Sequence, residues 1–332
     1  MNIRNRREMT SIAAQRLSSA PQEKRIVLIY TGLVLGANIL SVLLSYVLGL
    51  QIDQTTGLRG LSTRNTLSAI QTMLPLVQSV LVMCLDLGYL SSMLRIARGQ
   101  YASPNGLRLG FDRFWVLLRS QIILGLFYVG ICIVSVYASS MIYMITPLSK
   151  GTMELLMPLM SEASLLNPEI LLEGAVYDQL LSTMTPAFVL FGIVFIALYI
   201  PVTYRFRMTR YIIIEKPGIG AIAALRESRM MMRGNAVNLF KLDLHLWWYY
   251  AALVVSSVIC YGDQILPMLG VEFPFSSDLA YFLFYGAYWV IQSAIYCFLR
   301  NRTEVTYALA YDAIKPEEKK DTGVVLGNIF QM

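Results

Sequence analysis

Asp86 is the strongest candidate for a functional residue, because its carboxylate interrupts the apolar stretch "LVMCLDLGYLSS". A carboxylate inside a membrane is costly when ionised, unless it is paired or wetted. It can bind a proton or a cation in a transport path, or it can be protonated and join two helices by a hydrogen bond. Both hypotheses stay open, with the structural role slightly preferred, because no Lys or Arg is expected at the same depth in another span. The expected partners are neutral: Ser256, Ser257, Gln292, Ser293 and nearby tyrosines.

The other residues that could bind a metal or act in catalysis are one histidine and four cysteines. His245 stands at the start of an apolar segment in "KLDLHLWWYY", where an interfacial position beside two tryptophans is expected. The cysteines show no C-x-x-C spacing, which argues against a redox motif or a zinc site. They are expected to pack inside apolar segments as small hydrophobic residues. They are Cys84, Cys132, Cys260 and Cys297.

Sequence motifs of enzymes are missing from the chain. It contains no H-E-x-x-H, no G-x-S-x-G, no phosphate-binding G-x-x-x-x-G-K-[ST] and no G-x-G-x-x-G. An intramembrane aspartyl enzyme needs two facing carboxylates, and only Asp86 lies within an apolar segment. We therefore expect no enzymatic activity, no catalytic residues, no cofactor and no metal.

The elements that must position Asp86 are transmembrane helices. Of 332 residues, 56% are hydrophobic and only 14% are charged, against about 25% charged in soluble proteins. The charges are bunched, and the gaps between them have the length of about 20 residues that a helix needs to cross a bilayer. We expect an all-α polytopic bundle with short amphipathic surface helices. Its six spans cover about 26–50, 65–94, 120–149, 179–204, 244–262 and 279–299.

Basic residues give this bundle an orientation. Of the 27 Lys and Arg, 24 fall in segments that six spans would place on one side of the membrane. The positive-inside rule then predicts that both termini are cytoplasmic. The net charge of +6 is therefore explained by orientation and by contact with anionic phospholipid headgroups, not by nucleic acid.

Around the transmembrane domain at 26–300 we expect a basic cytoplasmic segment at 1–25 and a cytoplasmic tail at 301–332. Met9, Ala13 and their helical neighbours could lie in the lipid interface. The long outer connection at 148–178 is expected to form amphipathic helices. Its role is open: it either packs as a lid or contacts an external partner or ligand.

The stretch at 217–234 is expected to be a short cytoplasmic helix, because Pro stands near its start and Gly near its end. One face of it is predicted to carry Ile222, Leu225, Arg229 and Met232, with Asn235 capping the next helix. Its basic surface is expected to face water or anionic headgroups. That surface consists of Arg226, Arg229 and Arg233.

Two stretches resemble the domain of unknown function 975 family, integral membrane proteins of Firmicute bacteria. One is "YIIIEKPGIGAIAALRESRMMMRGNAVNLFKLDL" and the other is "LDLGYLSSMLRIARGQYASPNGLRLGF". The resemblance implies a membrane location and a helical fold, and it implies no activity. The long connection at 148–178 and the charged C-terminal tail depart from the family pattern. The matching motif positions are Pro217, Gly220, Ser228, Gly234, Asn235 and Asp243.

Three functions remain at this point. A transport-related protein, either a small permease or an accessory subunit, predicts a polar cavity around Asp86. An interaction or scaffold protein with a membrane-protein partner predicts a tightly packed bundle without a continuous cavity. A lipid-handling enzyme, the weakest of the three, requires a polar cluster near His245 and Asp243.

Overall fold

The computed structural model describes residues 5–54, 60–147, 149–150, 174–268 and 277–315, and all regular elements in these ranges are helices. Four helices are long and apolar enough to cross a membrane, or five if one bent pair counts as a single span. These observations indicate a membrane protein. The expected outer amphipathic helices at 148–178 lie outside the described residues, apart from Ser149, Lys150 and the start of one span at Gly174.

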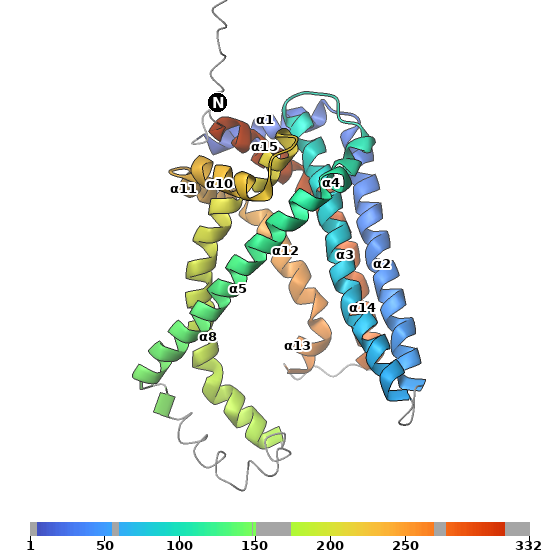
Figure 1. Ribbon diagram of the computed structural model, residues 1–332, viewed down its shortest axis with the longest axis vertical. Coiled ribbons are helices and arrows are strands. Elements are labelled where there is room, and N and C mark those ends of the chain that lie inside the picture. Colours follow the sequence, from blue (N-terminus) through green and yellow to red (C-terminus); the bar gives the residue numbers. More distant parts are fainter. Residues whose placement is uncertain (1–4, 55–59, 148, 151–173, 269–276, 316–332) are drawn as a thin grey trace, which may run out of the picture.

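The first four expected spans are present as long helices. They are α2 (Glu23–Gln54), α3 (Gly60–Ala97), α5 (Phe114–Ile145) and α8 (Gly174–Phe206). α2 packs against α3, and α5 packs against α8. Figure 1 shows the second pair splayed away from the first, so that the two pairs diverge from one end of the molecule. The sequence boundaries were short by a few residues at most ends, because the helices continue into polar residues beyond the apolar segments.

The fifth expected span corresponds to one helix, which is joined through a sharp bend to the helix before it. α11 (Ala236–His245) and α12 (Trp247–Cys260) meet at Leu246 with an angle of 67°. α13 (Gly262–Met268) follows, and α12 packs against α14 (Ser277–Ile295). α14 covers most of the sixth expected segment, but it is not among the candidate spans of the described residues.

Short helices gather at the end where the two long pairs converge (Figure 1), and we call them the helical cap. They are α1 (Arg6–Ser18), η1 (Pro104–Arg108), α4 (Leu109–Asp112), α9 (Thr209–Glu215), α10 (Ala221–Met232), α11 and α15 (Asn301–Ile314). Most fully buried residues of the described chain belong to this cap or to the adjacent ends of α2 and α3. The hydrophobic core therefore lies at one end of the bundle.

The segments near the two ends of the described chain are packed in the protein core, whereas the sequence suggested that they lie at its periphery. α1 contacts α15 and α3, and Met9 and Ala13 are fully buried, so the apolar face of α1 meets protein instead of lipid. The first part of the expected C-terminal tail forms α15, in which every residue from Val305 to Tyr311 is buried. α15 is thus a core helix, which its polar and aromatic composition did not reveal.

Close packing of the cap on α3 depends on Gly110. A Cβ atom added at Gly110 would lie 1.8 Å from the carbonyl oxygen of Cys84, so only glycine fits there. This contact fixes α4, and with it the entry of the chain into α5, against α3.

Candidate functional site

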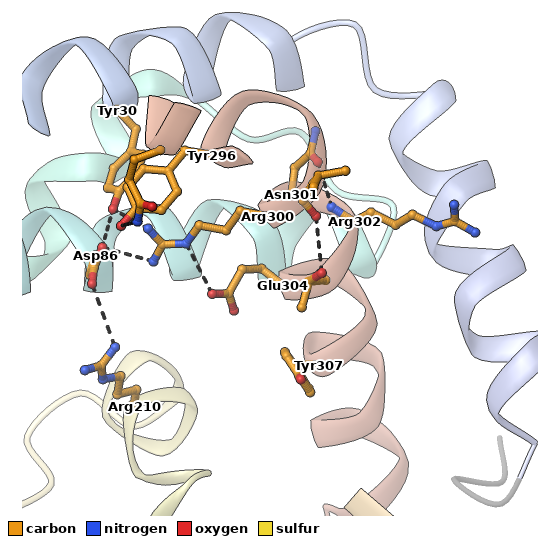
Figure 2. A network of polar contacts seen from close by, with 12 residues as sticks. Tyr30, Asp86, Arg210, Tyr296, Arg300, Asn301, Arg302, Glu304 and Tyr307 are labelled. Atoms are coloured by element: carbon orange, nitrogen blue, oxygen red, sulfur yellow. Dashed lines mark hydrogen bonds and ion pairs between the residues drawn. The ribbon is translucent and has the colours of Figure 1, made fainter. Parts of the chain in front are cut away.

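Asp86 on α3 is the centre of a polar cluster formed by three other segments. Its carboxylate accepts a hydrogen bond from the hydroxyl of Tyr30 on α2. Arg300 places its Nη2 3.1 Å from Oδ1 of Asp86 and its Nη1 2.5 Å from the Tyr30 hydroxyl. Arg210 on α9 approaches Oδ2 from the opposite side at 4.0 Å. Figure 2 shows Tyr30, Arg300 and Arg210 converging on this one carboxylate.

Asp86 was expected to have only neutral partners, and this expectation is wrong. Of the expected kinds of partner, only a tyrosine, Tyr30, contacts its carboxylate. Arg300 lies just beyond the expected sixth span and Arg210 just beyond the fourth, so neither was counted at the depth of Asp86. The expected partner Ser256 instead donates to Gln292 at 3.1 Å, and Ser257 donates to its own helix. Asp86 is therefore placed against two guanidinium groups, with Arg300 at 3.1 Å and Arg210 at 4.0 Å.

Arg300 is almost enclosed, with 11% of its side chain exposed. It ends a π-helical turn, Tyr296–Arg300 (η3), which connects α14 to α15. Its guanidinium lies over three aromatic rings, at 4.8 Å from the ring centre of Tyr296 and 5.1 Å from those of Tyr30 and Tyr89. Such contacts stabilise a desolvated cation. Glu304, one turn later, lies 3.5 Å from Nε of Arg300 and supplies a second carboxylate.

Arg210 is held much less firmly than Arg300. Its side chain is 43% exposed, and among the described residues Asp86 is its one ionic partner. An ion pair at that distance and exposure contributes little to stability. Arg210 is therefore a charged group beside Asp86 that is free to change partners.

Two cavities meet at Asp86, Gln121 and Arg210, which line both of them. The first, of about 290 Å³, extends toward the cap, where Glu304 and Tyr307 lie on its wall. The second, of about 600 Å³, extends in the other direction, to Gln78 and Asn38. Gln78 is two turns from Asp86 along α3, or about 12 Å. The polar space around Asp86 thus reaches from the cap into the interior of the bundle.

A second polar cluster surrounds Asp243 of α11, which is buried. Its Oδ2 accepts from Tyr204 and pairs with Arg207, and its Oδ1 accepts from Tyr307 at 2.6 Å. Arg207 also donates to Tyr250 at 2.9 Å. Burial is the main reason why the pKa of Tyr307 is raised, so this phenol stays protonated and donates to the carboxylate.

A third polar cluster joins the end of α3 to α9 and α15. Arg98, just after α3, lies 2.8 Å from Glu215 and 2.5 Å from Asp312. Lys315 and Tyr311 also bind Glu215, at 3.1 and 2.6 Å. The hydrogen bond to Asp312 is the largest contribution to the raised pKa of Arg98. Three ion-paired clusters therefore connect α3, α9, α11 and α15.

The stretch expected to hold a surface helix contains α10, between Ala221 and Met232. Gly220 is its N-cap residue, and Pro217 lies in the turn before it. Gly234 has a φ of +86°, a conformation that favours glycine. Asn235 precedes α11 as expected, but its amide donates back to the Met231 carbonyl at 3.0 Å and so closes α10 instead of capping α11.

The expected shared face of α10 is only partly correct. Leu225 and Met232 are buried, but Ile222 and Arg229 are exposed, and the buried face also contains Ala224 and Ser228. Ser228 donates to the Arg205 carbonyl at the end of α8, at 3.3 Å. The motif residue Ser228 therefore attaches α10 to a membrane-length helix.

A family model described as "Protein of unknown function (DUF975)" matches residues 1–317, which include α1, both motif stretches and α15. The chain belongs to this family. No curated protein and no solved structure matches it.

In this DUF975 protein, the motif stretches identified from the sequence correspond to the most tightly packed contacts of the cap. Arg98 and Gly110 lie in the stretch that contains Asp86. Glu215, Ser228 and Asp243 lie in the other stretch. Arg226, Arg229 and Arg233 are exposed, as expected.

The histidine and the cysteines of this DUF975 protein form no joint site in the described part of the chain. His245 ends α11 and is exposed beside Trp247. The four cysteines are unpaired, and Cys84 is buried while Cys132 is exposed on α5. Among the described residues, no group of three or more His, Cys, Asp or Glu side chains is placed to hold a metal ion.

Proposed function

We propose that this protein is a transport-related protein of the bacterial plasma membrane, either a small permease or an accessory subunit of a transporter. The observation that carries the proposal is the meeting of two cavities at Asp86, Gln121 and Arg210, whose polar and charged side chains line both of them. A transport function predicts such a cavity, whereas a purely structural bundle would fill the same space with side chains.

Six spans with both termini in the cytoplasm are part of this proposal. Four helices and one bent pair supply up to five spans, and α14 with η3 would supply the sixth. The helical cap, with the basic residues in it and in the turns and helix ends next to it, would then lie at the cytoplasmic face. Asp86 would lie near that face, where the first cavity connects it to the cap.

The charges around the junction favour a polar or charged solute. Arg210 is available to bind an anionic group because Asp86 is already paired with Arg300. An anion that displaced the weak contact to Arg210 would leave the Asp86–Arg300 pair intact. The geometry therefore favours Arg210 over Asp86 as the first group to meet a solute.

The two alternatives are supported less well. An interaction or scaffold protein with a membrane-protein partner does not require a cavity that extends from the cap to Gln78. A lipid-handling enzyme requires His245 and Asp243 to share one polar cluster, but His245 is exposed while Asp243 is buried against three partners.

Solute flux into liposomes that contain the purified protein tests the proposal. The panel should include anionic, zwitterionic and cationic solutes, and the variant should be Arg210→Gln, since Arg210 contributes little to packing. The proposal is supported if the wild type transports a solute and Arg210→Gln lowers its flux at least about tenfold. A loss of this size is expected when one charge-assisted hydrogen bond to the solute is removed. Arg119→Gln, at an exposed arginine of α5, is the matched control. Equal flux by Arg210→Gln and wild type would count against it, and no wild-type flux across the panel would favour the interaction protein.

A further inference from the structure

Four arginines on the cap surface have no acidic partner among the described residues. They are Arg205 at the end of α8 and Arg226, Arg229 and Arg233 on or just after α10. They differ in this from Arg98, Arg207 and Arg300, each of which pairs with a carboxylate. Like charges that are gathered without counter-ions repel one another, so such a group is most stable when an anion binds to it.

The four arginines line one groove of about 660 Å³. Arg226 and Arg229 lie three residues apart on one face of α10, and Arg233 directly follows its last residue. The hydrogen bond from Ser228 to the carbonyl of Arg205 fixes the end of α8 beside that face. The arrangement is therefore set by packing between two helices and does not depend on mobile side chains alone.

The groove also has an apolar part. Pro201, one turn before Arg205, lies within the candidate membrane span Met184–Glu215 and is exposed. Met230 adds a large apolar side chain that is 63% exposed. The groove thus runs from the surface of a membrane-length helix to a group of four cations. A small soluble anion would use the cations but would gain nothing from this apolar part.

We infer that this groove binds an anionic phospholipid, with its phosphate among the arginines and the start of its acyl chains along Pro201 and Met230. Guanidinium groups bind phosphate oxygens with two parallel hydrogen bonds, which a single lysine ammonium does not provide. A lipid headgroup at the end of α8 is at the depth where the apolar part of the helix gives way to charged residues. The site is independent of the cavities at Asp86.

Thermal unfolding of the full chain in a neutral detergent tests the inference. Adding phosphatidylglycerol is expected to raise the Tm by at least about 3 °C more than adding the same amount of phosphatidylcholine, since a ligand bound only by the folded state stabilises it. In Arg226→Gln/Arg229→Gln/Arg233→Gln this difference should disappear. Met230→Glu, a carboxylate placed in the groove at an exposed position, should abolish it by repulsion and provides a second variant if the triple one does not fold.

The matched control is Arg95→Gln/Arg108→Gln/Arg119→Gln, which removes the same charge from three exposed arginines outside the groove. It should keep the phosphatidylglycerol effect. The inference is overturned if the wild type shows no difference between the two lipids, if both groove variants keep it, or if the control loses it. An equal rise in Tm with inorganic phosphate or with polyglutamate would also overturn it, in favour of a soluble anion or an acidic protein segment.

Discussion

Arg300 lies 3.1 Å from Asp86 although 214 residues separate them, and this pair joins the second membrane-length helix to the turn η3 that leads into α15. Both side chains are largely withdrawn from solvent, with 11% of Arg300 and 19% of Asp86 exposed. The pair therefore connects the polar junction of the two cavities to the packed cap.

Removing the charge of Asp86 should destabilise the protein, because the buried Arg300 would keep only one of its two carboxylate partners, Glu304 at 3.5 Å. Asp86→Asn is expected to lower the free energy of unfolding by about 3 kcal/mol, the usual cost of breaking a buried ion pair from one side. Thermal unfolding in detergent measures this. Asp86→Asn/Arg300→Gln should recover part of the loss. A single Asn variant as stable as the wild type would show that the pair is not formed.

Tyr307 should contribute to stability through its hydroxyl, which donates to Asp243 at 2.6 Å and contacts the hydroxyl of Tyr250 at 2.6 Å. Tyr307→Phe keeps the ring and removes a hydrogen bond to a charged acceptor, so a loss of about 2 kcal/mol is expected. Tyr101→Phe, at a side chain that is 73% exposed, is the control and should be silent. Equal Tm values for the two variants would contradict the role of this cluster.

The helical bundle could be predicted from the sequence because uncharged segments of membrane length leave few alternatives. The break at Leu246 could not, since neither proline nor glycine marks it in the stretch "FKLDLHLWWYY". The burial of α15 was missed for a different reason. Its polar residues look like those of a tail until Arg98, Glu215 and Asp312 are seen to pair.

Part of the candidate site was also visible in the sequence. Asp86 stands alone in its apolar segment, and this was enough to identify it. Its cationic partners were missed because charges just beyond a span were assigned to the membrane surface, whereas Arg300 and Arg210 extend inward to meet the carboxylate. Long arginine side chains at helix ends can reach inward by several ångströms, so an arginine just beyond a span could have been considered as a partner of Asp86.

Gly110 should tolerate no side chain. In Gly110→Ala the new Cβ would meet the backbone of α3 at Cys84, so α4 must move away, at an expected cost of about 2 kcal/mol. Gly130→Ala in α5 is the control, because nothing lies within 4 Å of the added atom and alanine favours the helix. The measurement is again the Tm in detergent. If the two alanine variants have the same Tm, the close approach of α4 to α3 is wrong.

The proposed six-span topology makes a prediction at both ends of each span. Reporter fusions after residues 58, 160 and 270 should report the outer side of the membrane, and fusions after 105, 225 and 320 the cytoplasm. The position at 225 decides most, because it lies in α10, next to the arginine groove. If it reports the outer side, the cap and its basic residues face outward, against the positive-inside rule. The position at 270 tests whether the bent pair α11–α12 crosses the membrane: a cytoplasmic signal there would mean that it turns back, and that α14 is not a sixth span.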